Sequence, residues 1–408
     1  MDYRIFPPDE ILQASVDLPL SKSMSARALL INKIGKFDVD VEVSDSDDTK
    51  ALIRGLEADH GVVNVDGAGT AMRFLTAYYA AKPGTDIVLQ GNERMHQRKI
   101  GELVKALREL GADIEYMGTE GYPPLHIRGK KLSGGQVTLD PSVSSQYVSA
   151  LMMIAPMMDD DLTLRFDAEP ASMSYIRMTI AMMEQAGVEV ERSFNGIEIA
   201  HGHYTKPITH IERDWSAASY WYSIAALTAG WVTFNDMTAE SVQGDRNMIT
   251  FGERLGVITA ESEDVDGALE LSASPEQHSR LDADMSDNPD LVQTLAVAAA
   301  ALGIPFKFTG VQTLREKETD RLEALRKEAL KLGLIFEIDG DKSISWDGQR
   351  VPVVEMPRIS TYNDHRMAMA FAPLSVFIPG IIIEDIEVVS KSYPEFWTHL
   401  EEAGFTFE

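Results

Sequence analysis

The stretch "LVKALRELGADIEY", Leu103 to Tyr116, predicts the fold class. Leucine and valine recur three and four residues apart up to Leu110, which is the spacing of one helix face. Gly111 follows where a helix commonly ends in a left-handed residue, and the alternating residues after it are typical of a strand. The stretch therefore predicts a helix that stops at a glycine and leads into a β-strand.

The same pattern occurs six times along the chain of 408 residues. Successive glycines lie 50, 76, 69, 77 and 71 residues apart. The repeating unit is therefore roughly 70 residues long, and the first repeat is trimmed. A unit of this length is a small α/β module, so six of them indicate two domains of three modules each. The glycines are Gly61, Gly111, Gly187, Gly256, Gly333 and Gly404.

A second kind of helix is expected between these repeats. Each begins at a small polar or glycine-rich stretch and continues with almost only apolar residues. Helices that are hydrophobic on nearly every face are buried, so their N-termini are the parts that can reach a binding site. The six stretches begin at Ser21, Gly67, Ser144, Asp214, Asn288 and Asn363.

Arginines stand near several of the expected helix N-termini, in these apolar helices and in "TDRLEALRK", which starts at Thr319. A basic side chain there costs a few tenths to about 1 kcal/mol, because the helix end carries partial positive charge. If Thr70, Thr319 and Asn363 cap their helices, an arginine still follows in the first turn. The placement is favourable when an anion binds, because N–H groups and guanidinium then act together. A solvated surface explains one such arginine, but four indicate a multiply anionic ligand such as a phosphate: Arg27, Arg73, Arg321 and Arg366.

The other polar clusters are less specific. The glycine-rich loop before Thr70 could approach a phosphate, and Ser144 could bind a ligand or simply cap a helix. Asp290 fits either a dipole-complementing residue or a catalytic base. The alternating charges of "LREKETDRL", Leu314 to Leu322, also suit a solvated helix start. Local patterns thus indicate an α/β transferase or ligase that acts on phosphorylated small molecules.

Composition excludes several classes of protein. The chain is 44% hydrophobic and 25% charged, which is ordinary for a globular protein. It lacks roughly 18 uninterrupted apolar residues and begins "MDYRIFPPDE", so we expect a cytoplasmic protein. A formal charge of -27 repels nucleic acid and anionic membranes. The absence of cysteine excludes disulfides, thiolate metal sites and a cysteine nucleophile, and the nine histidines show no metal-ligand spacing.

Nine stretches, in this order along nearly the whole chain, resemble the 5-enolpyruvylshikimate-3-phosphate (EPSP) synthase family. The combination of "SKSxSxR", "KExDR" and "YNDHRMAM" is the most specific part of the resemblance. The stretches are "LPLSKSMSARALL", "SDSDDTKAL", "AGTAMRFLTA", "NERMHQRKIGELVKAL", "SVSSQYVSALMM", "MSDNPDLVQTLAVAA", "LREKETDRLEAL", "TYNDHRMAMAF" and "SKSYPEFW".

The resemblance implies a two-domain inverse α/β barrel with three βαβαββ repeats per domain. Residues 1–19 and 214–408 would form one domain, residues 20–213 the inserted one, and the active site would lie in the cleft between them. The implied reaction moves the enolpyruvyl (1-carboxyvinyl) group of phosphoenolpyruvate to the 5-hydroxyl of shikimate 3-phosphate, releasing phosphate through a tetrahedral intermediate. No metal or organic cofactor is implied, and we expect a monomer whose partners are these two substrates.

Residue roles also follow from the resemblance. Asp290 would take the hydroxyl proton, and Glu318 and Lys22 would donate and relay protons, with acid and base able to exchange between half-reactions. Shikimate 3-phosphate would be held by Lys22, Ser23, Arg27, Ser144, Ser145, Gln146, Ser172, Tyr175, Asp290 and Lys317. Phosphoenolpyruvate would be held by Lys22, Gly69, Thr70, Arg98, Gln146, Arg321, Arg366 and Lys391.

Some points stay open at this stage. Leu20, Gly67 and Thr313 depart from the family's usual glycine, asparagine and asparagine, so weaker binding of shikimate 3-phosphate is conceivable. His365 and Asp364 fit either a supporting pair or a proton relay. Two alternative functions are the related transfer to UDP-N-acetylglucosamine, which uses a loop cysteine that this chain lacks, and anion binding without catalysis.

Overall fold

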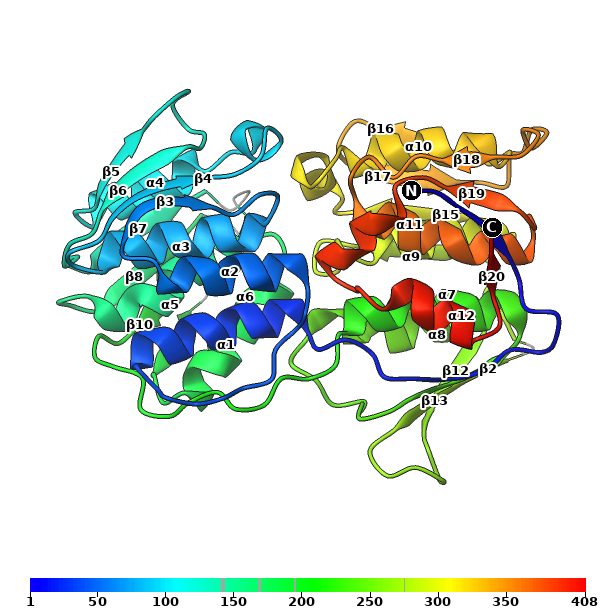
Figure 1. The fold of residues 1–408 in the computed structure, drawn as a ribbon, viewed down its shortest axis with the longest axis horizontal. Helices are drawn as coiled ribbons and strands as arrows, with labels where there is room; N and C mark the ends of the chain where they lie inside the picture. Colours follow the sequence, from blue (N-terminus) through cyan, green and yellow to red (C-terminus); the bar gives the residue numbers. More distant parts are fainter. Residues whose placement is uncertain (141–143, 168–169, 194–195, 275) are drawn as a thin grey trace. The chain divides into compact units, whose positions relative to one another are not determined.

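The computed structural model describes residues 1–140, 144–167, 170–193, 196–274 and 276–408. The chain divides into two compact units. Unit 1 comprises Met1–Pro19 and Glu212–Glu408, and unit 2 comprises Leu20–Ile211. Figure 1 shows the helices and strands of the units. Each unit has a hydrophobic core of its own. None of the helices within the described ranges is long and apolar enough to cross a membrane.

Each complete module has the order β-α-β-α-β-β and forms one four-stranded sheet. Its first two strands are parallel because a helix crosses between them, and its last two form an antiparallel hairpin beside the second strand. One module of unit 2 comprises β3 (His60–Asn64), α3 (Gly69–Ala81), β4 (Asp86–Gln90), α4 (Gly101–Glu109), β5 (Asp113–Tyr116) and β6 (Leu125–Arg128). The next comprises β7 (Gly135–Leu139), α5 (Ser145–Ile154), β8 (Leu162–Phe166), α6 (Met173–Gln185), β9 (Val190–Ser193) and β10 (Gly196–Ile199).

Unit 1 contains three such modules. The first comprises β2 (Gln13–Val16), α7 (Trp215–Thr228), β11 (Trp231–Phe234), α8 (Met248–Leu255), β12 (Val257–Glu261) and β13 (Leu269–Ala273). The second comprises β14 (Leu281–Asp284), α9 (Val292–Ala301), β15 (Phe306–Thr309), α10 (Arg321–Lys331), β16 (Glu337–Asp339) and β17 (Ser343–Trp346). The third comprises β18 (Arg358–Ile359), α11 (His365–Phe371), β19 (Ile381–Ile383), α12 (Phe396–Glu402), β20 (Thr406–Phe407) and β1 (Tyr3–Phe6).

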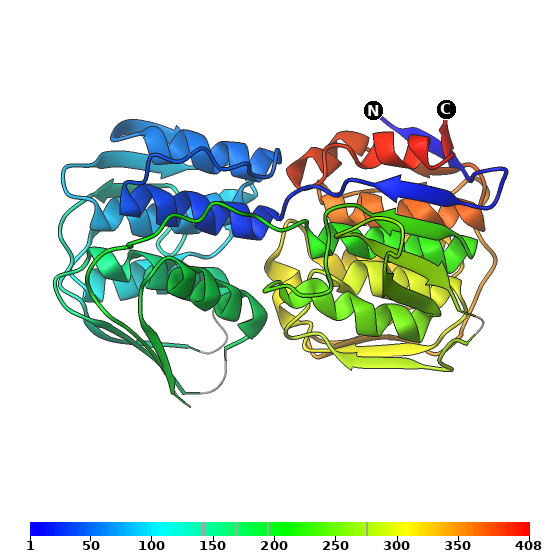
Figure 2. The same cartoon turned by 90° about the horizontal axis from the view of Figure 1, so that it is seen from below.

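The two ends of the chain meet in that third sheet. β1 pairs antiparallel with both β19 and β20, so the N-terminal strand supplies the last strand of the C-terminal module (Figure 2). Next to it in the chain, β2 pairs in parallel with β11 of the first module. Unit 1 is therefore completed from both ends of the sequence.

The predicted α/β class is confirmed, and five of the six repeat glycines end helices as predicted. These five adopt φ between +76° and +100°, where glycine carries no Cβ penalty: Gly111, Gly187, Gly256, Gly333 and Gly404. The prediction for Gly61 is wrong, because α2 (Asp47–Glu57) ends earlier and Gly61 lies within β3.

Unit 2 departs from three full repeats for the same reason. α1 (Lys22–Gly35) and α2 belong to a module whose hairpin is missing, since α2 leads directly into β3. Residues 36–46, which the structure describes, contain no strand. The short first spacing between the glycines thus reflects a pair of helices that lacks the four-stranded sheet of the other modules.

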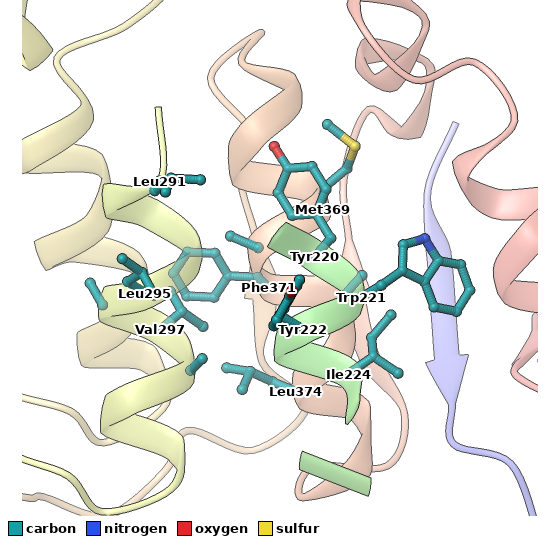
Figure 3. Packing of buried hydrophobic residues seen from close by; sticks show 14 of the residues in the cluster. Tyr220, Trp221, Tyr222, Ile224, Leu291, Leu295, Val297, Met369, Phe371 and Leu374 are labelled. Atoms are coloured by element: carbon teal, nitrogen blue, oxygen red, sulfur yellow. The ribbon is translucent and has the colours of Figure 1, made fainter. Parts of the chain in front are cut away.

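Three of the six helices that the sequence predicted to be buried lie in the core of unit 1. α7, α9 and α11 pack against one another. Figure 3 shows Leu295 of α9 and Phe371 of α11 next to each other, whereas Trp221 points away from them on the other side of α7; all three side chains are fully buried. Burial of such large side chains stabilises the unit by roughly 1.5–3 kcal/mol each relative to exposure.

A buried polar network connects the start of α7 with the segment before α9. Ser216 donates to Oδ2 of Asp245 at 2.5 Å, and the amide of Asn288 donates to Oδ1 of Asp245 at 3.2 Å. The same amide donates to the carbonyl of Gly244 at 2.8 Å. Burial, and next the charge of Asp290, raises the pKa of Asp245 to about 6.

We predict that Asp245→Asn changes how the free energy of unfolding depends on pH. The pKa of Asp245 is about 6 when folded against 3.8 for an ordinary aspartate, so the folded chain binds this proton more tightly. That stabilisation is present at low pH and is lost as pH rises through the folded value. From roughly pH 5 to pH 7 the wild type should lose about 1 kcal/mol relative to the variant.

Urea unfolding at both pH values, followed by tryptophan fluorescence, measures this difference. The same pH dependence in wild type and variant would contradict the prediction.

Candidate active site

Asp290 is at the centre of a cluster of charged side chains in unit 1. It precedes α9 by two residues, and its side chain is 17% exposed. Oδ1 accepts a hydrogen bond from Nη1 of Arg321 at 2.9 Å and lies 3.6 Å from Nζ of Lys317. Oδ2 accepts from Nη2 of Arg366 at 2.9 Å. Its environment is therefore that of a carboxylate held by three cations, and not only that of a dipole-complementing residue.

Arg321, the first residue of α10, is bound by three carboxylates. Nε donates to Asp364 at 2.7 Å, Nη1 to Asp290 at 2.9 Å, and Nη2 to Glu318 at 2.9 Å. The guanidinium side chain is only 2% exposed. Burial lowers the pKa of Arg321, but the carboxylates of Asp364, Glu318 and Asp290 more than offset this and raise it overall. Arg321 is thus a fixed positive charge.

Arg366, the second residue of α11, is bonded both to α7 and to the segment before α9. Nη2 donates to Asp290, and Nη1 donates to the hydroxyl of Tyr220 on α7 at 3.0 Å. Burial raises the pKa of Tyr220 to about 12, which keeps this hydroxyl neutral. The arginine is therefore aimed at Asp290 by a partner that is 146 residues away in the chain.

Two predicted helix caps are wrong by one residue. Asp364, and not Asn363, caps α11 and accepts from the backbone N–H of Arg366 at 3.0 Å. Asp320, and not Thr319, caps α10. Asp364 therefore has two functions, because the same carboxylate also binds Arg321. His365 is buried beside it, with Nδ1 3.6 Å from Oδ1 of Asp364.

Two lysines complete the cluster. Nζ of Lys391, at the end of the short helix Ile386–Lys391, lies 3.9 Å from Oε1 of Glu318. Lys317 is the more exposed of the two, at 26% of its side chain against 14% for Lys391. In these ion pairs four cationic side chains thus face three carboxylates.

In unit 2, Gly69 and Arg98 lie in close contact at the start of α3. A Cβ on Gly69 would stand 2.7 Å from Nη1 of Arg98, so only glycine fits there without moving the guanidinium. Arg73 donates to the carbonyls of Gly69 at 3.2 Å and Lys99 at 3.1 Å. These hydrogen bonds explain why an arginine stands at position 73, so a bound anion is not needed to explain it.

A second contact in unit 2 joins α3 to α5. Nε2 of Gln146 donates to Oγ1 of Thr70 at 3.0 Å. Thr70 is the second residue of α3 and does not cap it, because the cap position is Ala68. Ser144 caps α5 by accepting from the backbone N–H of Gln146 at 3.3 Å, and Ser145 begins that helix.

Lys22 begins α1 and forms an ion pair with Asp48 on α2. Its Nζ lies 3.2 Å from Oδ2 of Asp48, and the two side chains are 16% and 8% exposed. Ser23, the next residue, accepts at its carbonyl from Nη1 of Arg27 at 2.9 Å. The ion pair between Lys22 and Asp48 therefore fixes the lysine side chain against α2.

Arg27 joins α1, α5 and α6. Its guanidinium donates to the hydroxyls of Thr179 at 2.7 Å and Ser149 at 3.2 Å, and to the carbonyl of Tyr175 at 3.2 Å. Burial lowers the pKa of Arg27 to about 10. Ser172 stands at the N-cap of α6 with φ +58°, a strained value for a non-glycine residue.

The structure thus brings the predicted residues of unit 1 into one charged cluster and those of unit 2 into several smaller groups. Sequence reasoning missed Tyr220 and Asp48 as partners of these residues. Tyr220 lies in an apolar helix without any local polar signal. Asp48 lies in the quoted stretch "SDSDDTKAL", where nothing distinguishes it from its acidic neighbours.

Known proteins resemble this chain over its whole length. The family model described as EPSP synthase (3-phosphoshikimate 1-carboxyvinyltransferase) matches residues 36–400. A 3-phosphoshikimate 1-carboxyvinyltransferase of Bacteroides fragilis is 46% identical over 99% of this chain and 98% of that protein. One from Haemophilus influenzae is 34% identical, with 97% of each chain covered.

Solved structures agree on the fold. An EPSP synthase from Acinetobacter baumannii superposes with a TM-score of 0.75, covering 100% of this chain and 99% of that one at 21% sequence identity. The family model and the relatives, which extend over nearly all of the sequence, establish the assignment independently of this likeness. The chain belongs to the EPSP synthase (3-phosphoshikimate 1-carboxyvinyltransferase) family.

Proposed function

We propose that this chain transfers the 1-carboxyvinyl group of phosphoenolpyruvate to the 5-hydroxyl of shikimate 3-phosphate and releases phosphate. Membership of the family supports this reaction. The observation that carries it within the structure is Asp290, whose two oxygens are each held by a different arginine, Arg321 and Arg366. A base between two anion-binding groups is what an addition of a hydroxyl to an anionic enol ester requires.

The cations of unit 1 would bind phosphoenolpyruvate. Arg321, Arg366 and Lys391 now contact Asp290 and Glu318, at 2.9 Å and, for Lys391, 3.9 Å. The phosphate and carboxylate of the substrate would compete for the same guanidinium N–H groups. Asp290 would then be released from these bonds, and its oxygens could accept a proton from the 5-hydroxyl.

The proposed reaction has two steps. In the first, the 5-hydroxyl oxygen bonds to C2 of phosphoenolpyruvate, Asp290 takes the hydroxyl proton, and C3 takes a proton that the ammonium group of Lys22 supplies through Glu318. In the second, the C2–O bond to phosphate breaks, a proton returns from the new methyl group to Glu318, and the proton on Asp290 leaves with phosphate. Acid and base thus exchange roles between addition and elimination.

We propose that unit 2 supplies the remaining contacts. Arg98 and the backbone of Gly69 would bind phosphoenolpyruvate, and Ser144, Ser145 and Tyr175 would bind shikimate 3-phosphate. The other proposed contacts come from Lys22, Ser23, Arg27, Thr70, Gln146 and Ser172. We further propose that both substrates bind in a cleft between the units and that the units close on them.

The expectations about oligomeric state, location and further partners stay predictions. They are that the chain works as a monomer in the cytoplasm, and that it needs neither nucleic acid nor a membrane.

A phosphate-release assay tests the proposed function. We expect purified protein to release inorganic phosphate from phosphoenolpyruvate only when shikimate 3-phosphate is present. Replacing shikimate 3-phosphate by UDP-N-acetylglucosamine should give no release. Release with the nucleotide sugar would favour the related transferase, and no release with either acceptor would favour a non-catalytic anion-binding protein.

Asp290→Asn should reduce kcat by about 10²- to 10⁴-fold, because an amide cannot accept the hydroxyl proton. Steady-state rates with both substrates saturating measure the effect. The matched control is Asp282→Asn, since this exposed aspartate pairs with Arg280 on the surface of the same unit. Full activity of Asp290→Asn would refute the assignment of Asp290 as the base.

Gly69→Ala should raise KM for phosphoenolpyruvate by about tenfold, because the new methyl group would displace the guanidinium of Arg98, 2.7 Å away. KM for shikimate 3-phosphate should change much less. The control is Gly118→Ala, where the nearest atom to a Cβ is 3.8 Å away. An unchanged KM for phosphoenolpyruvate in Gly69→Ala would show that Arg98 does not bind this substrate.

A further inference from the structure

Residues 360–364, which lead into α11, have an unusual backbone. Tyr362 and Asn363 both adopt left-handed conformations, with φ of +55° and +56°. Such a conformation is uncommon for a bulky residue and persists only where the surroundings enforce it. The backbone N–H of Asp364 donates to the carbonyl of Thr361 at 2.9 Å, which closes the turn. The direction in which α11 begins, and with it Arg366, is set by this turn.

Glu328 on α10 is the side chain that holds the turn. Its Oε1 accepts from the hydroxyl of Tyr362 at 2.6 Å. Its Oε2 accepts from the backbone N–H of Ser360 at 3.0 Å and from Nζ of Lys331 at 2.6 Å. Burial, and next the bond to Glu328, raises the pKa of Tyr362, so this hydroxyl keeps its proton and donates.

The carboxylate of Glu328 is fully buried, with 0% of its side chain exposed. A buried charge is costly unless it is paired and hydrogen-bonded. Lys331 supplies the countercharge and also donates to the carbonyl of Arg358 at 2.7 Å. None of the proposed proton transfers uses Glu328. We therefore explain its buried carboxylate by the groups that it binds, the N–H of Ser360 and the hydroxyl of Tyr362.

α10 contacts the segment at two places. Arg321 and Glu328 are seven residues apart, about two helical turns, so they lie on the same face of α10. Arg321 binds Asp364 at the end of the segment, and Glu328 binds Ser360 and Tyr362 near its start. The segment that aims Arg366 is thereby fixed at both ends by one helix.

We propose that Glu328 is a positioning residue for the phosphoenolpyruvate site: by fixing the left-handed turn at Tyr362, it sets the position of Asp364 and Arg366 opposite Arg321 and Asp290. The inference rests on the proposed function, because it assigns that site to phosphoenolpyruvate. It adds a residue that touches no substrate and acts through the backbone of residues 360–364.

The test compares three variants of the full chain. Glu328→Ala should raise KM for phosphoenolpyruvate by about 10- to 100-fold, as expected when a binding group is misplaced. Glu328→Gln keeps the shape and can still accept one hydrogen bond, so its increase should be smaller. Tyr362→Phe loses one buried hydrogen bond and keeps the ring, so KM should rise by about fivefold. The dissociation constant for shikimate 3-phosphate alone should change by less than about twofold in all three.

The matched control is Glu323→Ala. Glu323 lies on the exposed part of the same helix and pairs with Arg326, so both KM values should stay unchanged. A merely structural role for Glu328 would lower the folded fraction, and kcat would fall in proportion while KM stayed constant. That result in Glu328→Ala and Tyr362→Phe would overturn the proposal.

Amide hydrogen exchange separates this inference from the proposed function. In Glu328→Ala and Tyr362→Phe we expect faster exchange at residues 360–366, with the rest of unit 1 unchanged. Faster exchange there in a chain whose wild type releases no phosphate would support the positioning of the segment and refute the proposed function. Unchanged exchange at residues 360–366 would refute the positioning role, whatever the activity of the wild type.

Discussion

A buried guanidinium is costly unless its N–H groups are paired and hydrogen-bonded, and at Arg321 three carboxylates meet this constraint in unit 1. Its three partners come from separate parts of the chain: the segment before α9, the segment before α10 and the cap of α11. Asp290 also binds Arg366, and Arg366 donates a hydrogen bond to the hydroxyl of Tyr220 on α7. Ion pairs and hydrogen bonds thus connect α7, the start of α11 and the segment before α9, which belong to three modules. The remaining length of these helices is held together by apolar packing.

Much of the fold could be predicted because most modules repeat the same short-range sequence pattern. A helix period, a glycine and an alternating strand are short-range signals, and they identified five helix ends. The prediction that Gly61 ends a helix failed because a single sequence does not distinguish a glycine inside a strand from a glycine that follows a helix. The caps were misplaced where two capable residues are adjacent. Asn363 and Asp364 have nearly equal capping preference, and Arg321, distant in the chain, decides between them.

The charged residues of the site could be predicted better than their partners. Arginines placed against a helix dipole indicate an anion, and this signal is local. Tyr220 and Glu328 give no such signal. Tyr220 is one of several aromatic residues in an apolar helix, and Glu328 stands in "LEALRKEALK", a stretch that is typical of a solvated helix. Both act through contacts with residues at least 32 positions away, which only the folded chain brings together.

The pairing of β1 with β19 and β20 has a consequence for the order of folding during synthesis. Phe6 is opposite Thr406, so β1 cannot complete its pairing until β20 has been synthesised. Unit 2 is continuous in sequence and can form its core while unit 1 is still incomplete. The N-terminal residues therefore remain an unpaired strand for most of translation, and closure of their sheet is the step with the longest loop in the molecule.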